Sequence, residues 1–143
     1  MKFFQPIIDL FKRKPKEIKE PEQFKQLTKI EIIDYVVDYF QKNPRAKDGM
    51  NCLYLTKTGL RCGHSICLED DFVKNTPISR STNAEILINE HGDDIHKPEF
   101  RSHDSDFWMN IQRIHDNNYF WRDGELTDDG REFIKVLKQE YSN

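Results

Sequence analysis

The stretch Cys52-Leu-Tyr-Leu-Thr-Lys-Thr-Gly-Leu-Arg-Cys-Gly-His-Ser-Ile-Cys67 decides how the middle of this chain folds. Apolar and β-branched residues lie on both sides of Lys57-Thr58-Gly59, and a short turn containing glycine between two such runs is typical of a β-hairpin. The sequence therefore predicts a first strand over residues 52–56 and a second strand over residues 61–68. The same stretch holds all three cysteines of the chain.

Helical patterns lie on both sides of this hairpin. Thr28 with Glu31 forms a capping box, and the apolar stripe that follows ends at Asn43-Pro44. Thr82 with Glu85 forms a second capping box, whose helix stops at Gly92. Two further helices are expected after Ser105 and after Thr127. These patterns predict an α+β fold, in which residues 21–143 form a small single domain with one β-hairpin packed against three to four helices.

The N-terminal residues 1–16 carry a separate pattern. Apolar side chains fall on one side of a helix up to Phe11, and a basic, proline-containing linker follows. Two interpretations fit such a helix. It could lie on an anionic membrane surface, or it could pack on its own domain or on a partner chain. We favour packing, because one short helix and a few basic charges are a weak membrane anchor. If the helix packs on a second copy of this chain, the protein would form a homo-oligomer through it.

Composition excludes several classes of protein. The chain has 143 residues, which fits one domain, and its formal net charge is −3. A general nucleic-acid binder usually carries a basic excess, so we do not expect nucleic acid as the partner. The sequence contains no run of about 18 apolar residues, so we expect no transmembrane helix. Three cysteines without a secretion signal are expected to be reduced thiols, so the predicted location is the cytoplasm.

The hairpin also offers the ligand types of a structural zinc site. Cys52, Cys62, His64 and Cys67 would make a Cys₃His set, although their spacing matches none of the paired signatures of such sites. Alternation along a strand puts Cys67 on the face opposite to Cys62 and His64, unless a bulge at Gly63 corrects it. The favoured alternative is that the cysteines are small buried hydrophobes. Cys62 beside Arg61 is also weighed as a nucleophile.

Residues 91–116 are rich in histidine and aspartate. Such side chains could hold a divalent metal for phosphodiester hydrolysis, although most of them are expected in a solvated loop. The candidate ligands are His91, Asp93, Asp94, His96, His103, Asp104, His115 and Asp116. This metal-dependent hydrolase is the first alternative function.

Residues 124–134 resemble the junction that follows the wing in winged-helix proteins. In that reading Leu126 packs, Thr127 caps a helix, and residues 107–116 form the recognition helix. That helix offers one arginine, Arg113, where a DNA-binding helix needs several basic groups. A winged-helix-like nucleic-acid binder is therefore the second alternative function.

Several of these motifs occur together across residues 28–121, and the combination resembles a family of small uncharacterised phage and prophage proteins. The motifs are Cys52-Leu-Tyr54, Gly59, Arg61-Cys62, Asp70-Asp71, Ile111-Gln-Arg-Ile-His-Asp116 and Trp121. Gly63-His-Ser-Ile66 departs from the family, which commonly has an Ala-Ile/Val-Gly stretch there. The resemblance implies a phage-encoded protein in the host cytoplasm, where many small acidic proteins block host enzymes or defence proteins. We therefore expect a non-enzymatic protein that binds another protein.

Overall fold

The computed structural model describes residues 25–48, 51–52, 54–79 and 81–142, without the side chains of residues 47–48 and 51–52. The helix and linker predicted for residues 1–16 lie outside the described residues. Within the described part of the chain, five α-helices and two short antiparallel hairpins form an α+β domain, as expected. The elements are α2 (Lys29–Lys42), β1 (Lys47–Asp48), β2 (Asn51–Cys52), α3 (Asp70–Asn75), α4 (Ala84–His91), α5 (Ser105–Asp116), β3 (Trp121–Arg122), β4 (Glu125–Leu126) and α6 (Asp128–Tyr141).

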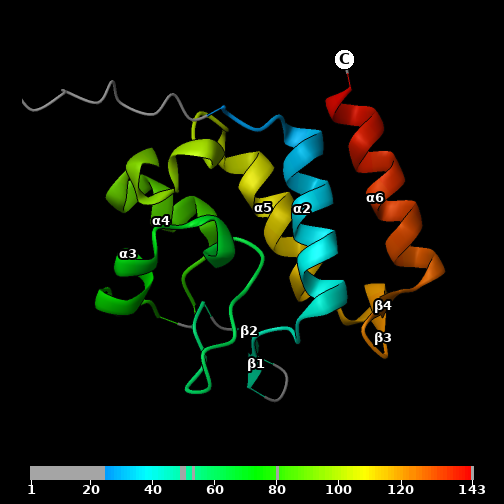
Figure 1. The fold of residues 1–143 in the computed structure, drawn as a ribbon, viewed down its shortest axis with the longest axis horizontal. Helices are drawn as coiled ribbons and strands as arrows, with labels where there is room; N and C mark the ends of the chain where they lie inside the picture. Colours follow the sequence, from blue (N-terminus) through cyan, green and yellow to red (C-terminus); the bar gives the residue numbers. More distant parts are fainter. Residues whose placement is uncertain (1–24, 49–50, 53, 80, 143) are drawn as a thin grey trace, which may run out of the picture.

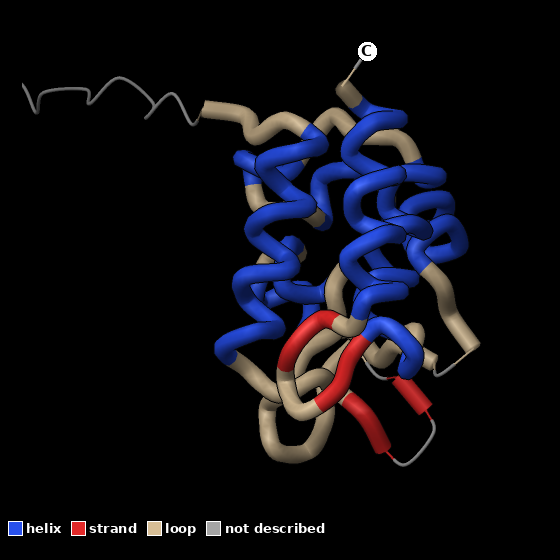
Figure 2. Tube along the Cα trace, turned by 90° about the vertical axis from the view of Figure 1, so that its right-hand side faces the viewer, coloured by secondary structure: helices blue, strands red, loops and turns tan. Residues whose placement is uncertain are grey.

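The three longest helices, α2, α5 and α6, lie side by side, and both hairpins lie at one end of them (Figures 1 and 2). The shorter helix α4 packs against α5 on the other flank. In the described residues no helix is long and apolar enough to cross a membrane.

The long helices begin at the caps that the sequence predicts. The Thr28 hydroxyl accepts a hydrogen bond from the Glu31 amide, and the Glu31 carboxylate accepts one from the Thr28 amide, so the first capping box is confirmed. Thr127 caps α6 in the same way. The second box is displaced by one residue, because Asn83 rather than Thr82 caps α4. The Asn83 side chain accepts a hydrogen bond from the Ile86 amide.

Apolar side chains from these helices form two adjoining cores. The main core lies between α2, α5 and α6, and the second core lies under the 54–73 segment. The main core contains Ile32, Ile33, Val36, Phe40, Ile66, Cys67, Ala84, Phe100, Phe107, Trp108, Ile111, Ile114, Trp121, Ile134 and Leu137. The second core contains Tyr54, Cys62, Leu68, Val73, Leu87 and Ile95.

The second strand predicted over residues 61–68 is wrong. A single bridge between Leu55 and Arg61 closes the turn, and the chain then enters a 3₁₀ helix at Ser65–Cys67. The Ser65 hydroxyl accepts a hydrogen bond from the Cys62 amide at 2.8 Å, which draws the backbone into the turn. Gly63 lies so close to α5 that an added Cβ would be 2.9 Å from the Ile111 carbonyl oxygen. The hydrogen bond of Ser65 and the close contact of Gly63 with α5 therefore favour a turn here instead of a strand.

The segment between α4 and α5 is more structured than the solvated loop that was expected. Two 3₁₀ turns, Asp93–Ile95 and Pro98–Phe100, follow Gly92. Residues 67–69 pair with residues 95–97: the Glu69 amide donates to the Ile95 carbonyl at 2.8 Å, and the Lys97 amide donates to the Cys67 carbonyl at 2.9 Å. This pairing holds the histidine-rich segment against the cores.

Candidate functional site

Four polar side chains form a continuous line of hydrogen bonds between the two cores. The Tyr54 hydroxyl lies 2.9 Å from His64 Nδ1, and His64 Nε2 lies 2.9 Å from His96 Nε2. His96 Nδ1 then lies 2.9 Å from the Asp93 carbonyl oxygen and 3.1 Å from Asp93 Oδ1. We call these four residues the histidine chain. Both of its imidazoles are fully buried.

The partners of the histidine chain decide where its protons lie. Both groups facing His96 Nδ1 are acceptors, so Nδ1 carries the proton and Nε2 of His96 is bare. His64 must then donate from Nε2 to His96, which leaves Nδ1 of His64 to accept from the Tyr54 hydroxyl. With both histidines neutral, all hydrogen bonds therefore run in one direction, from Tyr54 to Asp93.

Aromatic packing and the low polarity of the buried surroundings keep the histidine chain neutral. Trp108 stacks on His96, with the two ring centroids 4.5 Å apart. The centroid of Trp108 also lies 5.1 Å from that of the His64 ring. Burial lowers the pKa of His64 well below its usual value and also lowers that of His96, although Asp93 acts in the opposite direction on His96. Burial raises the pKa of Tyr54. None of the three groups is charged near neutral pH.

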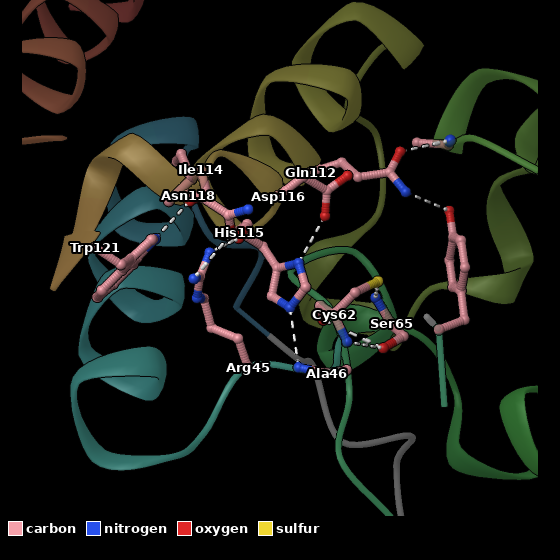
Figure 3. A network of polar contacts seen from close by, with 12 residues as sticks. Arg45, Ala46, Cys62, Ser65, Gln112, Ile114, His115, Asp116, Asn118 and Trp121 are labelled. Carbon is pink, nitrogen blue, oxygen red and sulfur yellow. Dashed lines mark hydrogen bonds and ion pairs between the residues drawn. The ribbon is translucent and has the colours of Figure 1, made fainter. Parts of the chain in front are cut away.

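A second polar cluster surrounds His115 at the end of α5 (Figure 3). His115 Nδ1 lies 2.6 Å from Asp116 Oδ1, and Nε2 accepts a hydrogen bond from the Ala46 amide at 3.1 Å. This neutral tautomer is fixed because the Ala46 donor needs a bare Nε2. Arg45 donates to the His115 carbonyl at 2.7 Å and to Asn118 Oδ1 at 3.3 Å. The cluster ties the end of α2 to the end of α5.

The buried cysteines are poor nucleophiles. Burial raises the pKa of Cys62 to about 11, and the negative charge of Asp116 acts in the same direction. Burial also raises the pKa of Cys67. Both thiols are therefore protonated near neutral pH, and the Cys62 sulfur accepts a hydrogen bond from the Ser65 amide at 3.3 Å. The geometry disfavours the nucleophilic cysteine that the sequence offered.

The side chains of three candidate zinc ligands are described, those of Cys62, His64 and Cys67, and they do not form a group placed to hold a metal ion. Cys62 belongs to the second core and Cys67 to the main core. Both nitrogens of His64, which lies between them in the sequence, are engaged by Tyr54 and His96. The Cys52 side chain lies outside the described residues. In the described part of the chain, no three His, Cys, Asp or Glu side chains are placed to hold a metal ion.

The histidines of the 91–116 segment point to different places. His91 ends α4 at the surface, and His96 belongs to the histidine chain. His103 Nε2 lies 2.9 Å from the Leu27 carbonyl oxygen, next to the start of α2. His115 lies at the far end of α5, about 18 Å from His103 at the helical rise of ~1.5 Å per residue. The segment does not assemble the metal centre that a hydrolase would need.

The surface around the β3–β4 hairpin is hollowed on two sides, and we call it the hairpin face. One hollow of about 920 Å³ is lined by residues 118–131, and another of about 420 Å³ is lined by residues 40–45 and the hairpin. Trp121 lines both. Tyr119 stands in the larger hollow with 81% of its surface exposed. Residues 119–121 are all aromatic, and nothing in that pattern indicates that Tyr119 points outward.

Comparison with protein-family models, with curated proteins and with solved structures finds no match to this chain.

Proposed function

We propose that this chain is a non-enzymatic domain that binds another protein through its hairpin face. The observation that carries the proposal is Tyr119, a large aromatic side chain with 81% of its surface exposed. Exposed aromatic side chains of this size are enriched at protein interfaces and are frequent hot spots of binding energy. The phage-type resemblance supports a host enzyme or a defence-system component as the partner.

The backbone under Tyr119 is held in place, although the side chain is free. The Tyr119 amide donates to Asn117 Oδ1 at 2.9 Å, and the Tyr119 carbonyl accepts from the Thr127 hydroxyl at 2.5 Å. The Phe120 amide donates to the Asn117 carbonyl at 3.1 Å. An anchor on a fixed backbone loses little conformational entropy on binding, which favours affinity.

The surroundings of Tyr119 have the composition of an interface rim. Arg122 and Arg131 line the larger hollow with the carboxylates of Asp123 and Glu125. Trp121, 8% exposed, also lines this hollow and is fixed by a hydrogen bond of 2.8 Å from its indole nitrogen to the Ile114 carbonyl. An aromatic centre with charged groups around it provides orientation as well as contact area.

The interior supports the non-enzymatic part of the proposal. His64, His96 and His115 have both ring nitrogens engaged by groups of the same chain. A general base needs a nitrogen within reach of a substrate, and these three nitrogen pairs are buried. Their partners instead connect segments that are distant in the sequence, which is a structural role.

Site-specific crosslinking tests the proposal. A photoreactive phenylalanine analogue replaces Tyr119 in one variant and Val136 in a control, since Val136 is 51% exposed on α6. We expect one host protein to crosslink at position 119 and not at position 136. That protein, once purified, should bind the unmodified chain at least about tenfold more tightly than Tyr119→Ser, the loss of ~1.4 kcal/mol that a modest hot spot produces.

Two outcomes would overturn the proposal. Equal crosslinking at positions 119 and 136 would show that the hairpin face is not the binding surface. Metal-dependent cleavage of nucleic acid or cyclic nucleotides by the purified chain, lost in His103→Ala and retained in His91→Ala, would replace binding by the hydrolase alternative. A gel shift that weakens steeply with salt would replace it by nucleic-acid binding.

A further inference from the structure

We propose that the facing imidazoles of His64 and His96 form a proton-sensitive latch. At neutral pH the latch holds the 54–69 segment against residues 93–97, and it opens when the pair takes up a further proton. The inference concerns a conformational change of the domain and is independent of the proposed binding function.

The number of protons that the pair can hold follows from its geometry. The two Nε2 atoms lie 2.9 Å apart, which leaves room for one proton between them. When the histidine chain is neutral, this proton belongs to His64 Nε2, and the other ring proton belongs to His96 Nδ1. A third proton must reverse the bond to Tyr54 or place two N–H groups against each other. Both arrangements put a positive charge into the buried space between the cores.

The groups around the pair offer limited compensation for that charge. Asp93 faces His96 from the same 3₁₀ turn, with Oδ1 3.1 Å from Nδ1, and its Oδ2 already accepts from the Ser102 amide at 2.9 Å. The Arg101 guanidinium donates to the His96 carbonyl at 2.9 Å and would repel an imidazolium. The pair has no carboxylate of comparable distance on the His64 side among its described contacts.

Helix α5 and the 54–65 segment provide neutral groups on the remaining sides. Trp108 covers both rings, and Gln112 Nε2 lies 3.5 Å from the Tyr54 hydroxyl. Cys62, the titratable group beside Tyr54, is protonated at neutral pH because its pKa is about 11. Asp116 acts on Tyr54 and Cys62 electrostatically, and His103 acts on His96 as a like charge when protonated.

The direction of the pH dependence follows from proton binding. An exposed histidine has a pKa near 6.5, and both latch histidines have a lower pKa in the closed domain. The open form therefore binds more protons below about pH 6.5. The latch contributes its full stability above this pH and loses it progressively as the pH falls further.

The latch should open locally before the domain unfolds. The 54–69 segment reaches residues 93–97 through the histidine pair, the bridge of Leu68 with His96, and the amides of Glu69 and Lys97. Helices α2, α5 and α6 pack through the apolar side chains of the main core, and the latch histidines touch that core through the ring of Trp108. A charge on the pair therefore weakens the first set of contacts and leaves the second intact.

Amide hydrogen exchange between pH 7.5 and pH 5.5 tests the latch, with each rate corrected for the intrinsic effect of pH. We expect the protection of the Glu69 and Lys97 amides to fall about tenfold for each latch histidine that is charged only in the open form. The amides in the middle of α2 should change less than threefold. A parallel fall in both groups of amides would overturn the proposal, since it would mean global unfolding.

Variants separate the latch from other titrating groups. His64→Gln removes one imidazole, so the extra loss of protection at Glu69 and Lys97 should shrink by about tenfold at pH 5.5. His91→Gln is the matched control at the surface and should keep the full pH response. If His64→Gln does not fold, the wild-type exchange profile decides alone. A full response in His64→Gln would contradict the latch.

Discussion

The three-helix region and the histidine-chain region are buried equally well but are stabilised by different interactions. Ile32, Ile111 and Ile114 in the first region have no exposed surface, and neither do His64 and His96 in the second. Apolar side chains pack against any apolar neighbour of suitable shape. Buried histidines need specific partners with the correct proton, because an unsatisfied polar group costs free energy in the interior. The second region therefore depends on a particular set of side chains.

Substitution in the three-helix region should have the largest effect. Ile111→Ala removes a fully buried side chain from the middle of α5. We expect a loss of about 2–5 kcal/mol in the free energy of unfolding, from lost apolar burial and the cavity left behind. Urea denaturation measures it. The matched control Val136→Ala, at a half-exposed position of α6, should change stability by no more than about 0.5 kcal/mol.

Substitution in the histidine-chain region should cost less but should show a different signature. His64→Phe keeps a ring of similar size, and it leaves His96 Nε2 without its donor and the Tyr54 hydroxyl without its acceptor. We expect a loss of about 1–3 kcal/mol in the free energy of unfolding at pH 7.5, because buried polar groups are left without a hydrogen-bond partner. The loss relative to wild type should shrink at pH 5.5, because the variant no longer has to keep this imidazole neutral. A constant difference at both pH values would argue against a neutral histidine pair.

The smallest effect concerns a feature that both the sequence and the structure identify. Thr28→Ala removes the hydroxyl that accepts from the Glu31 amide at the start of α2. The expected loss is about 1 kcal/mol, typical of a helix cap. Thr28→Ser, which keeps the hydroxyl, should lose less than half of this. A larger loss in Thr28→Ala would indicate that residues beyond the cap depend on it.

The comparison also explains how much of the fold could be predicted. The caps at Thr28 and Thr127 and the end of α2 at Asn43 follow local rules, and the structure confirms them. The helix expected after Ser105 is α5, and Trp108 lies on its buried face. Such elements depend on neighbours within one turn of helix, which the sequence contains.

The sequence predictions fail where contacts between distant residues determine the local structure. The second strand was predicted because residues 61–68 follow a short turn containing Gly59, but Ser65 bonds to the local backbone and Gly63 packs on Ile111. His96 was expected in a solvated loop, although its partners lie 32 residues away at His64 and in the stacked ring of Trp108. No local pattern distinguishes a histidine that finds a buried partner from one that meets water. The candidate hydrolase residues between 91 and 116 were grouped by closeness in sequence, and their side chains do not converge on a metal site in the structure. The zinc prediction stays untested, because the Cys52 side chain lies outside the described residues.

The central claim is that the buried histidines are neutral structural groups, each fixed in one tautomer by its partners. Nitrogen NMR of the imidazole rings in the intact chain at pH 7.5 tests it most directly. The account predicts a proton on Nε2 of His64 and on Nδ1 of both His96 and His115, each without exchange between tautomers. Averaged signals, or an imidazolium at His64 or His96, would contradict it and would return these histidines to the candidates for catalysis or metal binding.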